Sequence, residues 1–271
     1  MKHLSMEEKS RMERDGFHIA RALFNTEEIS EIRRVFQEQG DSGVTPGLQN
    51  DDRLQSNEAL AKYPRMMMPH RHADLPVGPV SLSAMLDPRI GDILHDLYGE
   101  AAVAAQSMFY FKPPQARGQG LHQDNFYLKV APANCMAAWV AVDDADEDNG
   151  GLMVIPGSHK LGLVCPEQAD PTVSFTTEHI PTPEGMQVVP VIMKAGDVLF
   201  FTGSLIHGSY PNTSDTRSRR ALIFHYGPAS MKEISGHYKP LLDFEQHELD
   251  GVLAATGGGP CGTEFVAVGS A

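Results

Sequence analysis

The second half of the chain is a succession of short β-rich segments, and this pattern constrains the fold more than any other feature. Runs of branched and aromatic residues, separated by turn-forming residues, occupy positions 101–112, 126–130, 136–142, 152–155, 187–193, 197–202 and 221–226. Short strands at such spacing are typical of two sheets packed face to face. We therefore expect a mainly β protein with flanking helices, folded as a double-stranded β-helix, the jelly roll of cupin-like proteins.

The first hundred residues carry helical patterns instead. Ser5 can cap a helix over residues 6–15, and Asn25 or Thr26 precedes a run with helical spacing that extends to about Gln39. A further helix is expected over residues 87–98, ended by Gly99.

The length of 271 residues, without internal repeats or a Pro/Ser-rich linker, predicts a single domain over residues 1–271. Its helical part covers about 1–100, its β core about 101–230 and a C-terminal extension about 231–271. Residues 256–260, rich in glycine, are expected to form a flexible tail or lid.

One segment inside the β-rich half carries metal-binding chemistry. His122 and Asp124 are two residues apart, and on a strand such residues point to the same face. A further imidazole, His207, follows an apolar, strand-like run. Two histidines and a carboxylate form the facial set of non-haem Fe(II) oxygenases, which leaves positions open for a co-substrate and dioxygen. We predict these three residues as metal ligands and catalytic residues.

Arginines follow His207 and suggest what the co-substrate is. The planar fork of an arginine makes two parallel hydrogen bonds to a carboxylate, which suits the far end of a metal-chelating dicarboxylate such as 2-oxoglutarate. Arg217, Arg219 and Arg220 are all available, and they equally fit a solvated basic turn. Alternation places Arg219 and Arg220 on opposite faces of a strand, without indicating which face is inward.

Other polar residues are weaker candidates for a role in metal, co-substrate or substrate binding. His72 and Asp74 repeat the His-x-Asp spacing, but they precede a proline in a loop-like context. The segment His70-Arg71-His72 is either a solvated basic loop or a grip for an anionic substrate. His225, on an apolar strand, is expected to be a core histidine. On the strand before His122, one of three residues is expected to reach the co-substrate: Gln106, Tyr110 or Lys112. We take Gln106 as the cofactor-binding residue.

As a set, these segments resemble the phytanoyl-CoA dioxygenase family of Fe(II)/2-oxoglutarate oxygenases over about residues 10–230. The resemblance rests on residues 122–124, 139–145, 149–159, 207–209 and 219–222. It implies Fe(II), 2-oxoglutarate and O2 as cofactors, with His122, Asp124 and His207 on the metal. It also implies that Arg219 holds the distal carboxylate of 2-oxoglutarate, that Ser209 assists it, and that Trp139 lines the same pocket. The interval from His207 to Arg219 is one residue longer than the family pattern, which keeps Arg217 as an alternative.

The resemblance implies a hydroxylase that acts on a C–H bond of a small, polar or anionic organic molecule, with succinate and CO2 as co-products. An aspartate at position 124 favours hydroxylation over halogenation, whereas desaturation and ring closure would use the same ligands. Two alternatives stay open: a cupin-type isomerase or dioxygenase that does not use 2-oxoglutarate, and a non-catalytic ligand-binding barrel. An arginine clamp has no purpose in the former, and retention of all three ligands argues against the latter.

Composition limits the classes of partner that the chain is expected to bind. The net charge of −13 argues against nucleic acid and anionic membranes, because both would repel the chain. Cys135, Cys165 and Cys261 are few and lack metal-ligand spacing, which favours free thiols in a reducing compartment. With no apolar leader and no run of membrane-span length, we expect a cytoplasmic protein. The sequence leaves the oligomeric state and the substrate open.

Overall fold

The computed structural model describes residues 4–49 and 58–255. Most of its helices lie in the first hundred residues. In chain order they are α1 (Met6–Asp15), α2 (Thr26–Asp41), α3 (Ala59–Lys62), the 3-10 turn η1 (Pro69–Arg71), α4 (Val77–Met85) and α5 (Pro88–Tyr98). The helices predicted over 6–15, 25–39 and 87–98 are thus present. Helix α4 was not expected from the sequence, since Pro76 directly before it lies in a loop-like context.

Local side chains set the ends of these helices. Ser5 and Asn25 each accept a hydrogen bond from the backbone of the residue three positions on, where a glutamate bonds back to the cap, so α1 and α2 both begin with a capping box. Helix α5 begins at the cap Asp87 and ends at Gly99, whose φ of 73° is left-handed.

The strands form two main antiparallel sheets. The large sheet has the order β1 (Phe17–Ala20), β10 (Val198–Thr202), β5 (Met136–Ala141), β12 (Arg219–Pro228), β3 (Ala102–Lys112) and β2 (Met66–Met67). The small sheet has the order β4 (Gln119–His122), β11 (His207–Ser209), β6 (Leu152–Val154) and β9 (Val189–Pro190). Two minor ladders join β7 (Glu167–Gln168) to β8 (Glu178–His179), and β13 (Glu233–Ser235) to β14 (Leu253–Ala255).

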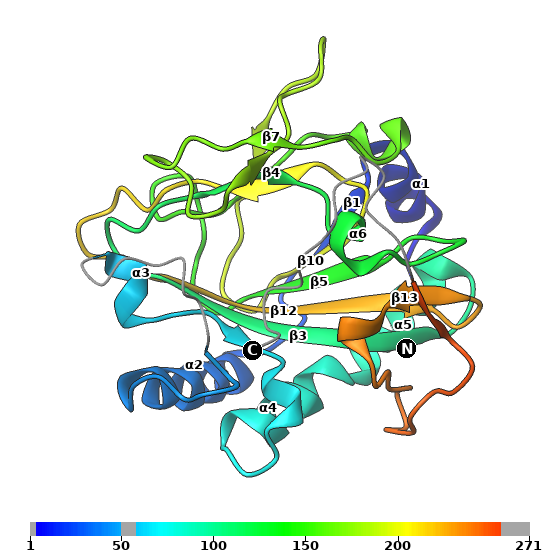
Figure 1. Cartoon of the computed structure of the whole chain (residues 1–271), viewed down its shortest axis with the longest axis horizontal. Helices are drawn as coiled ribbons and strands as arrows, with labels where there is room; N and C mark the ends of the chain where they lie inside the picture. The colour runs from blue at the N-terminus through cyan, green and yellow to red at the C-terminus, as the bar shows by residue number, and fades with distance from the viewer. Residues whose placement is uncertain (1–3, 50–57, 256–271) are drawn as a thin grey trace.

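Alternating side chains of the large sheet serve two different cores. On β5, Ala138 and Val140 face a cluster that includes residues of α2, α4 and α5, whereas Ala137, Trp139 and Ala141 face residues of the small sheet. Figure 1 shows the helices α2 and α4 on one side of the large sheet and β4 of the small sheet on the other. Both faces of the central strands are therefore buried.

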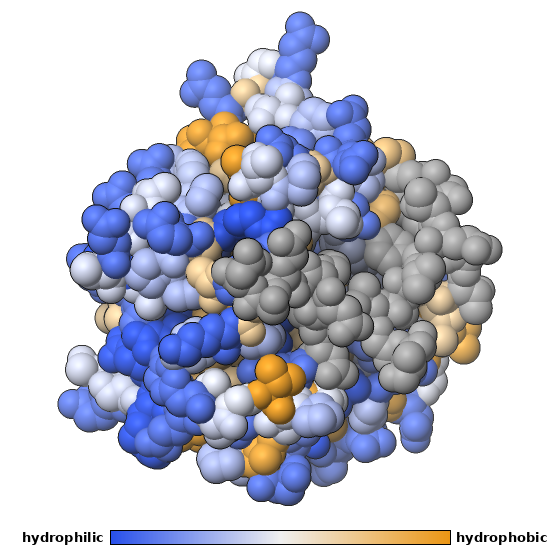
Figure 2. All heavy atoms as spheres, turned by 60° about the vertical axis from the view of Figure 1, so that its left-hand side comes forward, coloured by the Kyte–Doolittle hydropathy of each residue, from blue (hydrophilic) through white to orange (hydrophobic). Residues whose placement is uncertain are grey.

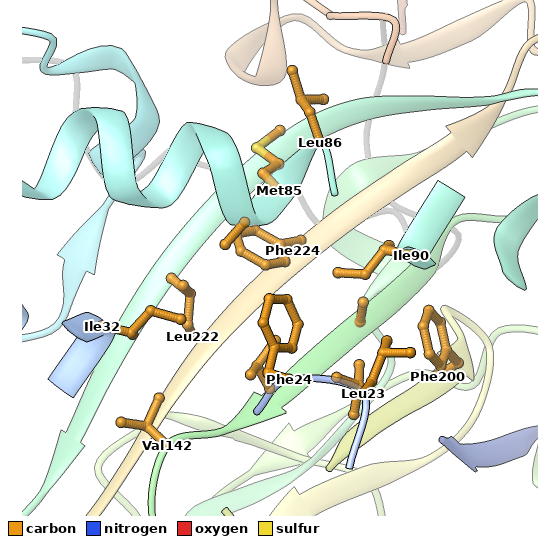
Figure 3. Close-up of a cluster of buried hydrophobic side chains, with 14 of the residues drawn as sticks. Leu23, Phe24, Ile32, Met85, Leu86, Ile90, Val142, Phe200, Leu222 and Phe224 are labelled. Atoms are coloured by element: carbon orange, nitrogen blue, oxygen red, sulfur yellow. The ribbon is translucent and has the colours of Figure 1, made fainter. Parts of the chain in front are cut away.

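The core between helices and sheet is densely aromatic (Figure 3). Phe36 of α2 stacks on Phe109 of β3 with ring centroids 4.1 Å apart. Phe224 and Leu222 of β12 pack in the same cluster, close to residues of α4 and α5. This packing makes the large sheet a rigid platform, because well-packed cores resist deformation.

Two expectations about secondary structure were wrong. Residues 126–130 were expected to be a strand, but Asn125–Leu128 form the short helix α6, followed by Lys129 at a φ of 56°. Residues 187–193 contribute only the two residues of β9. Several apolar side chains of the two segments, among them Phe126, Leu128, Val191 and Met193, are buried by tertiary contacts outside a regular ladder, so the β-rich composition misled the prediction.

The cysteine expectation was wrong in part. Cys135 is a buried free thiol, but Cys165 is in a disulfide. The expected tail or lid at 256–260 lies outside the described residues. Within the described residues, no helix has the length and apolar character needed to cross a bilayer. The face in Figure 2 is mostly hydrophilic, with hydrophobic residues alone or in small groups.

Candidate metal and co-substrate site

The three predicted ligands lie where β4, α6 and β11 meet. His122 ends β4 and pairs in register with His207, the first residue of β11. Asp124 is the N-cap of α6. Nε2 of His122 lies 3.5 Å from Oδ1 of Asp124, and Nε2 of His207 lies 3.6 Å from Oδ2. The structure therefore brings together the three side chains, whose ligand atoms all lie within 4.8 Å of one another.

The backbone reason for this convergence differs from the expected one. We expected His122 and Asp124 to share one face of a strand, but β4 ends at His122 and Asp124 has helical dihedrals (φ −65°, ψ −36°). The turn into α6 brings the carboxylate back toward the imidazole.

The second ring nitrogen of each histidine is held by the backbone. Nδ1 of His122 lies 2.9 Å from the carbonyl oxygen of Gly120, and Nδ1 of His207 lies 2.9 Å from that of Leu205. A carbonyl oxygen only accepts, so Nδ1 carries the proton and the Nε2 lone pair faces Asp124. This is the tautomer in which a histidine binds a metal through Nε2.

Electrostatics favour the metal-binding protonation states. Burial lowers the pKa of His207 to about 4, so its imidazole is neutral at pH 7. Burial opposes ionisation of Asp124, but the surrounding imidazoles, including the hydrogen bond that His225 donates, hold the pKa of this carboxyl well below its usual value. An ionised carboxylate and neutral imidazoles are the donor set that fits a first-row metal such as Fe(II).

His225 is a member of this site that the sequence did not identify. Its Nε2 lies 3.0 Å from Oδ2 of Asp124, and the carboxylate only accepts, so Nε2 donates. The expectation of a buried histidine is confirmed, since the residue is 2% exposed. No local signal reveals the contact with Asp124, because the two residues are 101 positions apart.

Replacing His225 with phenylalanine is expected to weaken metal binding about 10- to 100-fold, the usual cost of losing a hydrogen bond to a metal ligand. The ring volume is retained, but the donor that orients Asp124 is lost. Competition with a coloured chelator measures the affinity. His95→Phe, on the exposed face of α5, is the matched control. Equal affinities in the two variants would contradict a role for His225 in orienting the carboxylate.

A cavity of about 890 Å³ opens between the two sheets at this point. The large sheet contributes Gln106, Trp139, Phe201, Arg219, Ile223 and His225 to its lining, and β4 and β11 contribute Gln119, His122, His207 and Ser209. The loop-rich segments around 166–178 and 235–238, which include residues of β7, β8 and β13, also contribute to the wall. The three clustered side chains thus face a space large enough for small-molecule ligands.

One end of the cavity holds a buried cation. Arg219 is 3% exposed, donates from Nε to the carbonyl oxygen of Gly150 at 3.0 Å, and lies with its guanidinium carbon 5.4 Å from the Trp139 ring centroid. Burial lowers the pKa of Arg219 to about 10. Across the described residues, its terminal nitrogens have no hydrogen-bond partner and no carboxylate lies within ion-pair distance. A bound anion would satisfy them.

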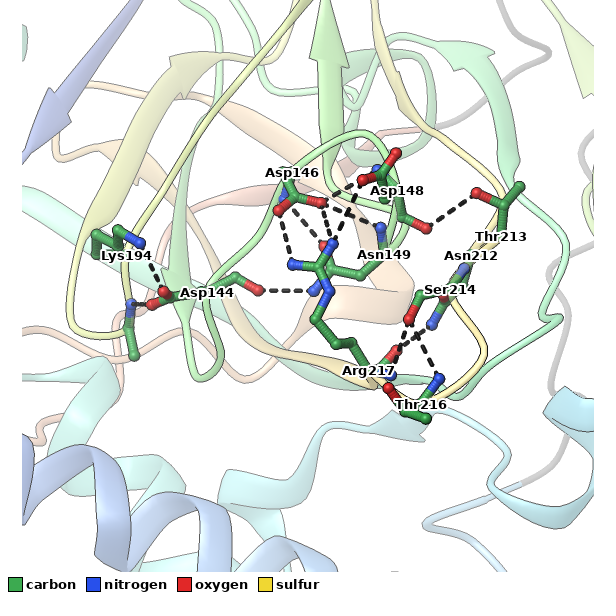
Figure 4. Close-up of polar contacts among 11 residues, drawn as sticks. Asp144, Asp146, Asp148, Asn149, Lys194, Asn212, Thr213, Ser214, Thr216 and Arg217 are labelled. Carbon is green, nitrogen blue, oxygen red and sulfur yellow. Dashed lines mark hydrogen bonds and ion pairs between the residues drawn. The ribbon is translucent and has the colours of Figure 1, made fainter.

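The rival arginines are engaged elsewhere. Arg217 is 43% exposed and binds both carboxylate oxygens of Asp146, at 2.7 and 2.8 Å (Figure 4). Arg220 lies on the opposite face of β12, where it pairs with Asp143 and with Gln37 of α2. Of the three arginines, only Arg219 lines the cavity.

The other predicted residues separate into two groups. Gln106 and Tyr110 line the cavity, and Lys112 contacts its lining through Ser209. In contrast, none of His70, Arg71 and His72 lines it: Nδ1 of His70 lies 2.6 Å from the Ser107 hydroxyl, and Arg71 donates to the carbonyl oxygen of Tyr238. A role of residues 70–72 in binding an anionic substrate is therefore not part of the function proposed below.

Among the described residues, the loop-like pair His72 and Asp74 joins no cluster with metal-ligand geometry. Asp243, Glu245 and His247 do form a second cluster, but all three side chains are at the protein surface, with His247 71% exposed.

Comparisons with known proteins identify the family to which the chain is similar. The model of the phytanoyl-CoA dioxygenase family matches residues 12–221. Phytanoyl-CoA dioxygenase 1 of Oryza sativa subsp. japonica is 29% identical over 214 residues, 78% of this chain and 75% of the rice protein. The peroxisomal phytanoyl-CoA dioxygenase of Rattus norvegicus is 27% identical over 247 residues, 86% of this chain and 71% of the rat protein.

Solved structures show which fold the chain shares. The non-heme alpha ketoglutarate dependent epimerase SnoN from nogalamycin biosynthesis superposes with a TM-score of 0.65 at 18% identity, over 83% of each chain. EctD from S. alaskensis, crystallised with 2-oxoglutarate and 5-hydroxyectoine, gives a TM-score of 0.64 at 20% identity, over 84% of this chain and 78% of EctD. With a family match that spans most of its length, the chain belongs to the phytanoyl-CoA dioxygenase family.

Proposed function

We propose that the chain is an Fe(II)- and 2-oxoglutarate-dependent dioxygenase that hydroxylates a C–H bond of a small, polar or anionic molecule. In this proposal the two sheets are the halves of a double-stranded β-helix in a single domain, and the cavity between them is the active site. The observation that carries the proposal is one cavity that contains the converging His122, Asp124 and His207 and also the buried, unpaired Arg219.

The metal ligand set and the buried Arg219 are explained together by one kind of ligand. A metal ligand set alone fits many cupin-like enzymes, but an unpaired guanidinium in the same cavity costs free energy unless an anion meets it. A dicarboxylate that chelates the metal at one end and pairs with Arg219 at the other satisfies both. This argues against the alternatives without 2-oxoglutarate.

The roles of the chain's own residues follow from their geometry. His122, Asp124 and His207 would hold Fe(II), while His225 keeps the Asp124 carboxylate oriented. Arg219 and Ser209 would bind the distal carboxylate, and Trp139 and Ile223 would cover it and exclude water. When bound, Fe(II) and 2-oxoglutarate supply the oxidising chemistry that activates O2 and attacks a C–H bond.

The remaining space is available to the primary substrate. At about 890 Å³ the cavity is larger than 2-oxoglutarate alone needs. Its wall carries polar groups from Arg65, Tyr110, Tyr127 and Glu178; Arg65 donates to the Tyr110 hydroxyl at 3.2 Å, and Tyr127 donates to Glu178. These groups favour a substrate with several polar atoms.

Succinate release tests the proposal. Purified protein incubated with Fe(II), ascorbate and 2-oxoglutarate is expected to form succinate slowly, and faster when a candidate substrate is added. Mass spectrometry of the stimulated reaction separates the outcomes: hydroxylation adds one oxygen atom, desaturation or ring closure removes two hydrogens, and epimerisation leaves the mass unchanged. No succinate from iron-loaded protein, with or without a substrate panel, would contradict 2-oxoglutarate dependence. Oxygen uptake without 2-oxoglutarate would favour the cupin-type alternative.

A further inference from the structure

Two buried cations lie side by side where Arg219 lines the cavity. Lys112 ends β3 and stands directly opposite Arg219 in the β3–β12 ladder. Gln106, Met108 and Tyr110 share the cavity-facing side of β3 with Lys112, because side chains two apart on a strand point the same way. Lys112 is 2% exposed and Arg219 is 3% exposed. Like charges in directly opposed positions repel each other.

Neither cation forms an ion pair in the part of the chain that the structure describes. Lys112 donates to the Ser209 hydroxyl and to the carbonyl oxygen of Tyr210, both at 2.7 Å, and to no carboxylate. Burial and the charge of Arg219 together hold the pKa of Lys112 well below its usual value. A bound anion would act in the opposite direction and stabilise both charges. The charges of Lys112 and Arg219 are therefore balanced only when an anion is bound.

Ser209 connects Lys112 to the cavity. An ammonium group has donors and no acceptor, so the Ser209 oxygen accepts from Lys112. The hydroxyl proton of Ser209 is then free to donate elsewhere. Because Ser209 and Arg219 line the same cavity, a carboxylate held by Arg219 is available to accept it. Without Lys112, the hydroxyl could rotate and accept instead.

We infer that Lys112 is a positioning residue for the distal carboxylate of the co-substrate, acting through Ser209. The inference rests on the proposed function and deepens it, since it predicts a selectivity for keto acids that carry a second carboxylate.

Trp139 provides a readout independent of turnover. It is the sole tryptophan in the chain and lies against Arg219, so its fluorescence reports on ligands at this end of the cavity. Mn(II)-loaded full-length protein would be titrated with 2-oxoglutarate and with 2-oxobutyrate, a keto acid without the distal carboxylate. Lys112→Met is expected to raise the Kd for 2-oxoglutarate about tenfold, the typical value of a charge-assisted hydrogen bond, and to leave the Kd for 2-oxobutyrate unchanged.

A double-mutant cycle tests whether Lys112 acts through Ser209. Ser209→Ala alone, and Lys112→Met with Ser209→Ala, are each expected to weaken 2-oxoglutarate about as much as Lys112→Met alone. Lys194→Met removes the same charge from a side chain that is 75% exposed and is expected to match the wild type. Thermal unfolding checks that each variant is folded, and Lys112→Gln replaces Lys112→Met if the latter is not.

Three results would overturn the inference: an unchanged Kd for 2-oxoglutarate in Lys112→Met, an equal loss for both keto acids, or losses that multiply in the double variant. Failure of the wild type to bind 2-oxoglutarate would instead reject the proposed function, so the two failures are distinguishable.

Discussion

Asp124→Ala is expected to lower metal affinity by more than about 100-fold, beyond the usual cost of losing a partner of a metal ligand, and to reduce succinate formation to background. The substitution removes the charged donor between His122 and His207. It also leaves His225 without its acceptor, so the buried imidazole loses its orientation. Metal content after dialysis and the visible absorption of Co(II)-loaded protein measure the first effect, and coupled succinate detection measures the second.

Asp74→Ala is the matched control, because Asp74 follows a histidine at the same spacing but is exposed and joins no ligand cluster in the described structure. It is expected to behave as the wild type. If Asp124→Ala retained metal with wild-type affinity, the three-ligand site would be wrong. If Asp74→Ala lost metal as well, the effect would be a general one of removing a carboxylate.

Arg219→Ala is expected to raise the KM for 2-oxoglutarate about 100-fold, since truncating one partner of a buried, charge-assisted contact costs several kcal/mol. Arg217→Ala is expected to change it less than about twofold, because Arg217 is exposed and paired with Asp146. Initial rates of succinate formation at varied 2-oxoglutarate give both values. The reverse ranking would assign the carboxylate to Arg217, the alternative that the His207–Arg219 interval kept open in the sequence.

Much of the fold was predictable because its signals are local. The helices α1, α2 and α5 have capping residues next to their first turns, and the apolar runs of β3, β5, β10 and β12 are long enough to be recognised. The small sheet was harder, since β4, β6, β9 and β11 have only two to four residues each. Helix α6 was missed because its aromatic residues are typical of strands.

The site shows the same division between local and long-range information. His122, Asp124 and His207 stand out by residue type and spacing, and Arg219 followed from the family resemblance. The choice between Arg219 and Arg220 depended on which face of β12 is inward, which the packing of Arg219 against Trp139 decides. Arg217 is set apart by its ion pair with Asp146. His225 and Lys112 act through contacts about a hundred positions away in the chain, so no local pattern reveals them.

The wall of the cavity is built from two kinds of segment, which tolerate amino-acid substitutions to different degrees. The cation pair and the clustered histidines stand on or next to the strands of the two sheets, where a substitution disturbs the core. Much of the remaining wall comes from the loop-rich segments around 166–178 and 235–238, whose strands have only two or three residues. Substrate preference can therefore drift among descendants of such a chain while the chemistry is inherited intact, so the identity of the substrate is to be sought in these loops and not in the strands.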